Sequence, residues 1–115
     1  MLVVRHKKKF LFSTILVFLA AGLLLSFRGS EVKTSFPVPR SAELTKQDMK
    51  ERYAEYSWGP ASESYGLPFY YTIIIRIWGW NQEMRFGATT YYEKQGTVIS
   101  ATSLNNNLFI SIEKE

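Results

Sequence analysis

Residues 10–27 read FLFSTILVFLAAGLLLSF and contain no charged side chain. At a helical rise of about 1.5 Å per residue this run is about 27 Å long, close to the hydrocarbon thickness of about 30 Å in a bilayer. The preceding RHKKK at residues 5–9 carries four formal positive charges, which favours a cytoplasmic N-terminus. The run therefore predicts a single-pass signal-anchor helix in the cell membrane, partnered by the lipid bilayer, with residues 1–9 as a basic cytoplasmic tail and the C-terminal domain outside.

A cleaved signal peptide is the alternative interpretation of the same run. Its length exceeds the apolar core of about 7 to 15 residues that is usual in signal peptides. The triplet AAG at residues 20–22 has the small-x-small pattern of a cleavage site, but cleavage there would leave three leucines at the new N-terminus. We therefore favour a retained anchor, and a secreted small domain is the alternative.

The charge distribution argues against nucleic-acid binding. The chain of 115 residues has a formal net charge of +4. Residues 1–27 hold four Lys or Arg and no acid, so the other ten basic residues and all ten acidic residues lie in residues 28–115. The outer part of the chain is formally neutral, and the electrostatic attraction that a nucleic-acid partner needs is missing.

The residue types also restrict the chemistry. The chain has no cysteine, and its only histidine, His6, lies in the basic tail. Thiol catalysis and sulfur-ligated metal are therefore excluded, and residues 28–115 have no imidazole for base catalysis or a zinc site. No Ser-x-x-Lys, Gly-x-Ser-x-Gly or glycine-rich phosphate loop occurs. We predict that the protein is not an enzyme and that it has no catalytic residues, no cofactor and no metal.

Two segments follow the apolar run. Residues 28–40 are polar, and Pro37 and Pro39 favour extended backbone, so we expect a linker there. Residues 41–115 then form one small outward-facing α+β domain.

The first element expected in this domain is a helix over residues 45–57. Thr45 and Asp48 have the spacing of a variant capping box. Gly59 and Pro60 are typical of a helix end. The helix presents one apolar stripe, made of Met49, Tyr53 and Tyr56.

Four strand-like runs follow a turn-rich loop at residues 61–68. They are residues 69–78, 83–93, 97–103 and 108–113. Gly and Asn in the turns at residues 94–96 and 105–107 supply the positive φ of tight hairpins. The predicted fold is one amphipathic helix packed on a four-stranded antiparallel meander.

Apolar alternation selects the strand register. In the last hairpin it pairs Ser103 with Leu108, Ala101 with Ile110 and Ile99 with Ile112. In the first it makes the odd residues from Phe69 to Ile77 a core face. The first hairpin then pairs Ile77 with Met84, Ile75 with Phe86 and Ile73 with Ala88, and a shift by two residues stays open.

The opposite sheet face is the candidate interaction or ligand face. Arg76 lies opposite Arg85 in the favoured register, and like charges so placed need neutralisation. One interpretation is therefore an anion or sugar-polymer site. The two-residue shift would pair Arg76 with Glu83 and leave an ordinary surface, whereas exposed apolar residues typically mark protein contact. The candidate residues are Tyr70, Ile74, Arg76, Trp78, Arg85 and Tyr91.

The predicted function is a noncatalytic interaction module at the cell envelope. It would contact another envelope protein through Tyr70, Ile74 and Trp78. The alternative is a binding domain for an anionic or sugar-containing envelope polymer, held by Arg76 and Arg85. An enzyme would need a sheltered Asp or Glu pair with a raised pKa. The sequence leaves the oligomeric state unknown.

Overall fold

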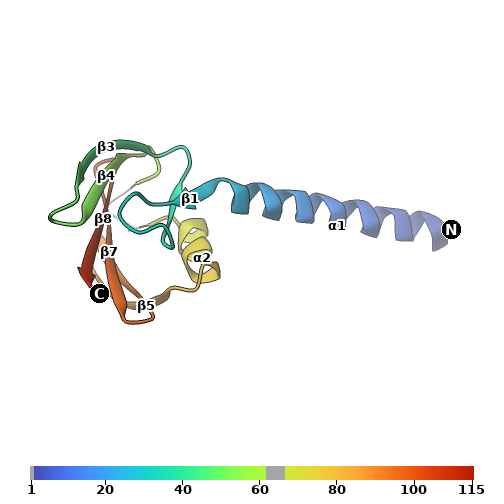
Figure 1. Cartoon of the computed structure of the whole chain (residues 1–115). Coiled ribbons are helices and arrows are strands. Elements are labelled where there is room, and N and C mark those ends of the chain that lie inside the picture. Colours follow the sequence, from blue (N-terminus) through green and yellow to red (C-terminus); the bar gives the residue numbers. More distant parts are fainter. Residues whose placement is uncertain (1, 62–66) are drawn as a thin grey trace.

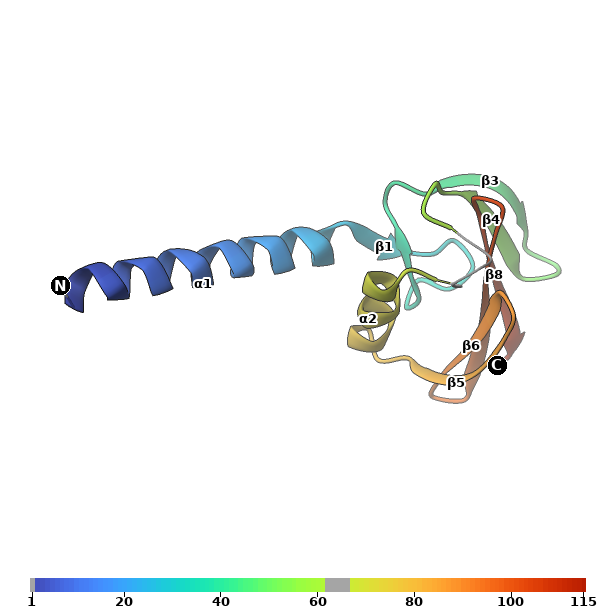
Figure 2. The same cartoon turned by 180° about the vertical axis from the view of Figure 1, so that it is seen from behind.

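The structure, a computed structural model, describes residues 2–61 and 67–115, with side chains from Leu11 onward. In this part of the chain two helices and eight strands form two antiparallel sheets. The larger sheet has six strands in the order β3-β4-β8-β7-β6-β5. Helix α2 (Phe69–Ile77) lies on the side of this sheet that faces helix α1 (Leu2–Leu25), and α1 extends away from the domain (Figures 1 and 2).

The membrane prediction is not supported. Within the described residues neither helix is long and apolar enough to cross a bilayer. Helix α1 ends at Leu25 because the chain turns there and buries Phe27, which is 4% exposed, in the domain core. The uncharged part of α1 is therefore residues 10–25, about 24 Å long and shorter than the hydrocarbon thickness of about 30 Å. The structure therefore does not support the predicted single-pass signal-anchor topology with a cytoplasmic tail and an external domain.

Residues 27–40 pack against the domain, where we expected a linker. Strands β1 (Phe27–Gly29) and β2 (Pro37–Pro39) pair with each other and form the small sheet. Phe36 and Val38 are fully buried in the core. Arg40 closes the start of the hairpin, because its Nε donates to the Leu25 carbonyl at 2.6 Å and its backbone N–H donates to Ser26.

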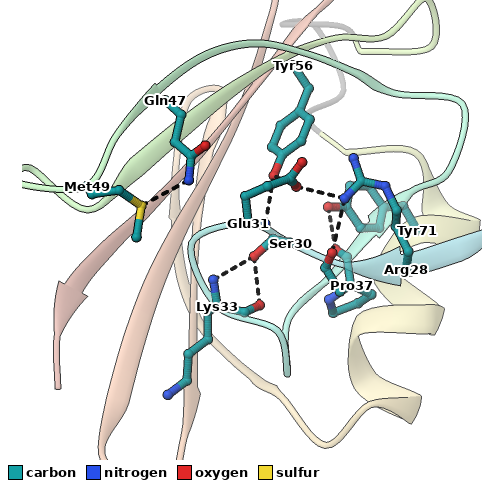
Figure 3. Close-up of polar contacts among 10 residues, drawn as sticks. Arg28, Ser30, Glu31, Lys33, Pro37, Gln47, Met49, Tyr56 and Tyr71 are labelled. Carbon is teal, nitrogen blue, oxygen red and sulfur yellow. Dashed lines mark hydrogen bonds and ion pairs between the residues drawn. The ribbon is translucent and has the colours of Figure 1, made fainter.

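A polar cluster holds this segment on the larger sheet (Figure 3). Glu31 accepts hydrogen bonds from Arg28 at 2.7 Å and from the Tyr56 hydroxyl at 2.8 Å. The Tyr71 hydroxyl of α2 donates to the Pro37 carbonyl at 2.8 Å and is completely buried. The segment after α1 is thus tied to both layers of the domain.

The helix predicted over residues 45–57 is wrong. The structure has the hairpin of β3 (Glu43–Asp48) and β4 (Tyr53–Ser57). Thr45 Oγ1 donates across the hairpin to the Glu55 carbonyl, and Asp48 accepts backbone hydrogen bonds from the two residues at 50 and 51. The same side chains that suggested a helix cap therefore stabilise a turn.

The strand predicted over residues 69–78 is also wrong, because this run forms α2. Pro68 precedes the helix, and its carbonyl accepts from the backbone N–H groups of residues 71 and 72. The buried side chains are Tyr71, Ile74 and Ile75, at the i, i+3, i+4 spacing of a helix face. The hairpin pairings predicted for Ile73, Ile75 and Ile77 consequently do not exist.

The C-terminal half agrees better with the sequence analysis. The run at residues 83–93 is two strands, β5 (Asn81–Phe86) and β6 (Thr89–Lys94), with Gly87 at a φ of 56° between them. Strands β7 (Thr97–Leu104) and β8 (Asn107–Lys114) form the last hairpin, and its three predicted pairs are confirmed. The four-stranded meander is therefore corrected to a six-stranded sheet. Most of the loop predicted at residues 61–68 lies outside the described residues.

Candidate functional site

The candidate site lies on the concave side of the sheet, at the end formed by β5 and β6. In this pair Gln82 is opposite Tyr92 and Arg85 is opposite Thr90. Residues directly opposite one another share a sheet face. Arg85 is therefore on the same face as Tyr92, whose ring packs 5.8 Å from that of Phe36 in the core.

An irregularity in β5 gives Arg85 this position. The register of β5 against β6 shifts between Gln82 and Met84. If Glu83 were paired regularly with Tyr91, Met84 would lie opposite Thr90 and Arg85 would be on the outer face. A bulge that re-aims one side chain is a common device at sheet edges and binding sites.

Arg76 reaches the same region from α2. It is an exposed residue in the last turn of the helix, where a positive charge is favourable next to the free carbonyl groups. The end of α2 is held on β6, because Lys94 Nζ donates to the Trp78 carbonyl at 2.8 Å. The site thus combines cations from a helix and from a strand that are separate in sequence.

The charges of both arginines act on one residue, Tyr92. Tyr92 is 2% exposed, and its hydroxyl has no hydrogen-bond partner among the described residues. Burial raises the pKa of Tyr92 to about 12, while the positive charges of Arg76 and Arg85 act on this pKa in the opposite direction. Both guanidinium groups are therefore within electrostatic reach of one buried, unpaired hydroxyl.

The two arginines retain most of their hydrogen-bonding capacity. Arg85 Nε donates to the Gly87 carbonyl at 2.9 Å in an exposed position. Neither arginine forms an ion pair with a carboxylate in residues 11–61 or 67–115. Each guanidinium has five N–H donors in a planar fork, so the pair can hold a carboxylate or phosphate group.

The structure places the other predicted site residues elsewhere. Ile74 is completely buried in the core, and Tyr70 and Trp78 are partly buried against it. These three residues of the α2 region therefore do not form an exposed face. Tyr91 lies half-buried on the outer sheet face, opposite Met84 and Ser100.

The strand pairing places six residues together on the outer face of β6, β7 and β8, namely Thr89, Tyr91, Ser100, Thr102, Phe109 and Ser111. Arg85 is missing from this set because of the bulge. Tyr92 was not among the predicted site residues, although apolar alternation with Ile99 across the hairpin places it in the core.

No cluster of His, Cys, Asp and Glu suited to a metal ion occurs among the described residues. The donors of the candidate site are cations and a neutral hydroxyl, which suit an anion. No protein-family model matches the chain, and no curated protein and no solved structure matches it either.

Proposed function

We propose that the protein is a noncatalytic binding module for a ligand that carries a carboxylate or phosphate group. The observation that carries this proposal is that Arg85 shares a sheet face with Tyr92, whose buried hydroxyl has no hydrogen-bond partner among the described residues. The positive charge of Arg76 acts on the same tyrosine. The arginines are exposed and make the first contacts. Arg85 then exchanges its hydrogen bond to the Gly87 carbonyl for one to the ligand.

The protonation states support binding in preference to catalysis. Tyr92 is neutral at physiological pH, and its raised pKa of about 12 keeps it neutral in alkaline solution as well, so its hydroxyl can donate to an anion. Arginine is always charged in proteins and serves anion recognition. Charge-assisted hydrogen bonds of this kind contribute about 1.5 to 3 kcal/mol each.

The alternative was an interaction face made of Tyr70, Ile74 and Trp78. We do not propose it, because Ile74 is buried and cannot contact a partner. The anionic-ligand hypothesis keeps both of its arginines, in a new geometry. The anion-binding residues are therefore Arg76 and Arg85.

The test is a titration of the full-length chain, kept dispersed by a nonionic detergent because α1 exposes apolar side chains. Inorganic phosphate and poly-L-glutamate are the two probes, and the Nε–H signal of Arg85 in an NMR spectrum reports binding. We expect a saturable shift with at least one probe. The double variant Arg76→Gln/Arg85→Gln should weaken binding at least about tenfold, which corresponds to about 1.4 kcal/mol.

The matched control is Lys46→Gln/Lys50→Gln, which removes the same charge from exposed positions in or next to β3. It should bind as the unaltered chain does. An equal loss in the control would mean that net charge alone attracts the probes, and the proposed site would be wrong.

A further inference from the structure

Strand β5 is a free edge of the six-stranded sheet. All six of its residues are exposed. An edge strand presents unpaired backbone N–H and C=O groups on the side away from its neighbour, and these groups can pair with another extended chain. The edge next to the arginine site is therefore chemically able to accept a further strand.

The two faces of β5 differ in chemistry. Met84 and Phe86 are on the outer face, 50% and 66% exposed, where they pair with Tyr91 and Thr89. Arg85 is on the concave face, which it shares with Tyr92, and the charge of Arg76 also acts on Tyr92. A strand that added to β5 would meet the apolar side chains of Met84 and Phe86 on one face and the positive charge of Arg85 on the other. The one acidic residue of β5, Glu83, lies at the bulge.

The opposite edge, β3, lacks this combination. Its residues are also largely exposed, but Thr45 is tied to Glu55 across the hairpin. Its only cation, Lys46, lies over the Tyr53 ring at 6.0 Å, and Lys46 is paired with Glu55 in the register. Charge complementarity therefore favours β5 over β3 as the position of an acidic partner.

We infer that the ligand is an extended acidic peptide that adds to β5 as a seventh strand, with alternate acidic and apolar side chains. The acidic side chains face Arg85 and Arg76, and the apolar ones cover Met84 and Phe86. Because side chains alternate across a strand, one peptide satisfies both faces. This inference rests on the proposed anion-binding function and specifies its ligand.

The test uses a blocked peptide of alternating Glu and Val, with a peptide of the same composition in Glu-Glu-Val-Val order as its control. Amide hydrogen exchange of β5 in the full-length chain is the readout. We expect the alternating peptide to slow exchange at one or more amides of Met84, Arg85 and Phe86 at least about tenfold, because new backbone hydrogen bonds protect them. The control peptide should bind at least about tenfold more weakly.

A charge swap tests the orientation of the peptide. The double variant Arg76→Glu/Arg85→Glu should lose the Glu/Val peptide and bind an alternating Lys/Val peptide. Both substitutions are at exposed positions, and an unchanged circular dichroism spectrum would show that the fold is intact.

The outcomes separate the inference from the proposed function. If phosphate or poly-L-glutamate binds through the arginines while the β5 amides stay unprotected, the strand inference fails and the anion site stands. If neither the probes nor the peptides depend on Arg76 and Arg85, both fail. Protection of β5 that depends on protein concentration without peptide would show that a second copy occupies the edge, and this result would also overturn the inference.

Discussion

Two buried hydroxyl groups have no hydrogen-bond partner within the described part of the chain, those of Tyr92 and Ser103. An unpaired buried polar group costs about 1 to 3 kcal/mol of stability. The two positions differ in their surroundings, because only Tyr92 has arginine charges acting on it. Comparing variants at Tyr92 and Ser103 therefore tests whether an unpaired hydroxyl is retained for binding or is only a packing defect.

The variant Tyr92→Phe should increase the free energy of unfolding by about 1 kcal/mol and weaken binding of the anionic probe. The phenylalanine ring keeps the contact with Phe36 and removes only the unpaired hydroxyl. Urea unfolding measures the stability, and the phosphate titration measures the binding. Gain of stability with loss of binding is the expected signature of a group retained for function.

Ser103→Ala is the matched control for this prediction. It also removes an unpaired hydroxyl from a completely buried position, so it should stabilise the fold by about 1 kcal/mol. Its affinity for the probe should not change. If Tyr92→Phe binds the probe as tightly as Ser103→Ala does, Tyr92 has no part in the site.

At the scale of elements, hairpin β7–β8 could be predicted and α2 could not. The Asn-rich turn fixes the hairpin, since Asn105 and Asn106 both have positive φ and apolar alternation then allows only one face inward. In α2 nearly every residue is apolar, so alternation and helical spacing both describe it. Such a run is ambiguous from periodicity alone, and burial of Tyr71, Ile74 and Ile75 against the sheet selects the helix.

The candidate site could be predicted only in part, because its geometry depends on whether residues 69–78 form a strand or a helix. Arg76 and Arg85 were both predicted from the sequence as site residues, and in the structure the charges of both act on Tyr92. The predicted register placed them opposite each other on one sheet, because residues 69–78 were assigned to a strand. The register shift at Glu83 and the docking of α2 depend on tertiary packing, and no local pattern reports either of them.

The turn between β6 and β7 offers a prediction at the scale of elements. Gln95 and Gly96 have φ of 53° and 85°, and Asn-Gly is the favoured pair in such a two-residue hairpin turn. The variant Gln95→Asn should therefore stabilise the fold by about 0.5 to 1 kcal/mol, because asparagine tolerates positive φ better than glutamine.

The shift of the urea midpoint would measure this gain. Gln47→Asn in β3 is the matched control, as it makes the same chemical change in a strand where φ is not positive. Asparagine is unfavourable in strands, so no gain is expected there. An equal gain in both variants would refute the turn argument.

At the scale of the whole molecule, the domain is held together by tyrosines that belong to different layers. Tyr71 of α2 bonds to Pro37 of β2, and Tyr56 of β4 bonds to Glu31 after β1. Burial raises the pKa of Tyr71, and burial together with the bond to Glu31 raises the pKa of Tyr56. Tyr92 of β6 adds a third raised pKa at the concave side of the sheet.

These raised pKa values predict that stability falls in alkaline solution. In the unfolded chain a tyrosine releases its proton near its ordinary pKa of 10.0, whereas Tyr92 in the fold holds it until about 12. Above about pH 10 the folded state therefore binds more protons than the unfolded state, and the free energy of unfolding decreases as the pH rises. Tyr92 alone accounts for about 2.3 kcal/mol by about pH 12.

Urea unfolding between about pH 8 and about pH 12 measures this decrease, and tyrosinate absorbance reports which state has ionised. Above about pH 10, Tyr92→Phe should make the decrease of the unfolding free energy with pH less steep by up to about 1.4 kcal/mol per pH unit. This is the contribution of one proton. Tyr56 and Tyr71 keep the remaining slope negative, because their pKa values are raised as well. A chain equally stable at about pH 9 and about pH 11.5 would contradict the burial of these hydroxyls, and with it the packing of α2 and β1–β2 on the sheet.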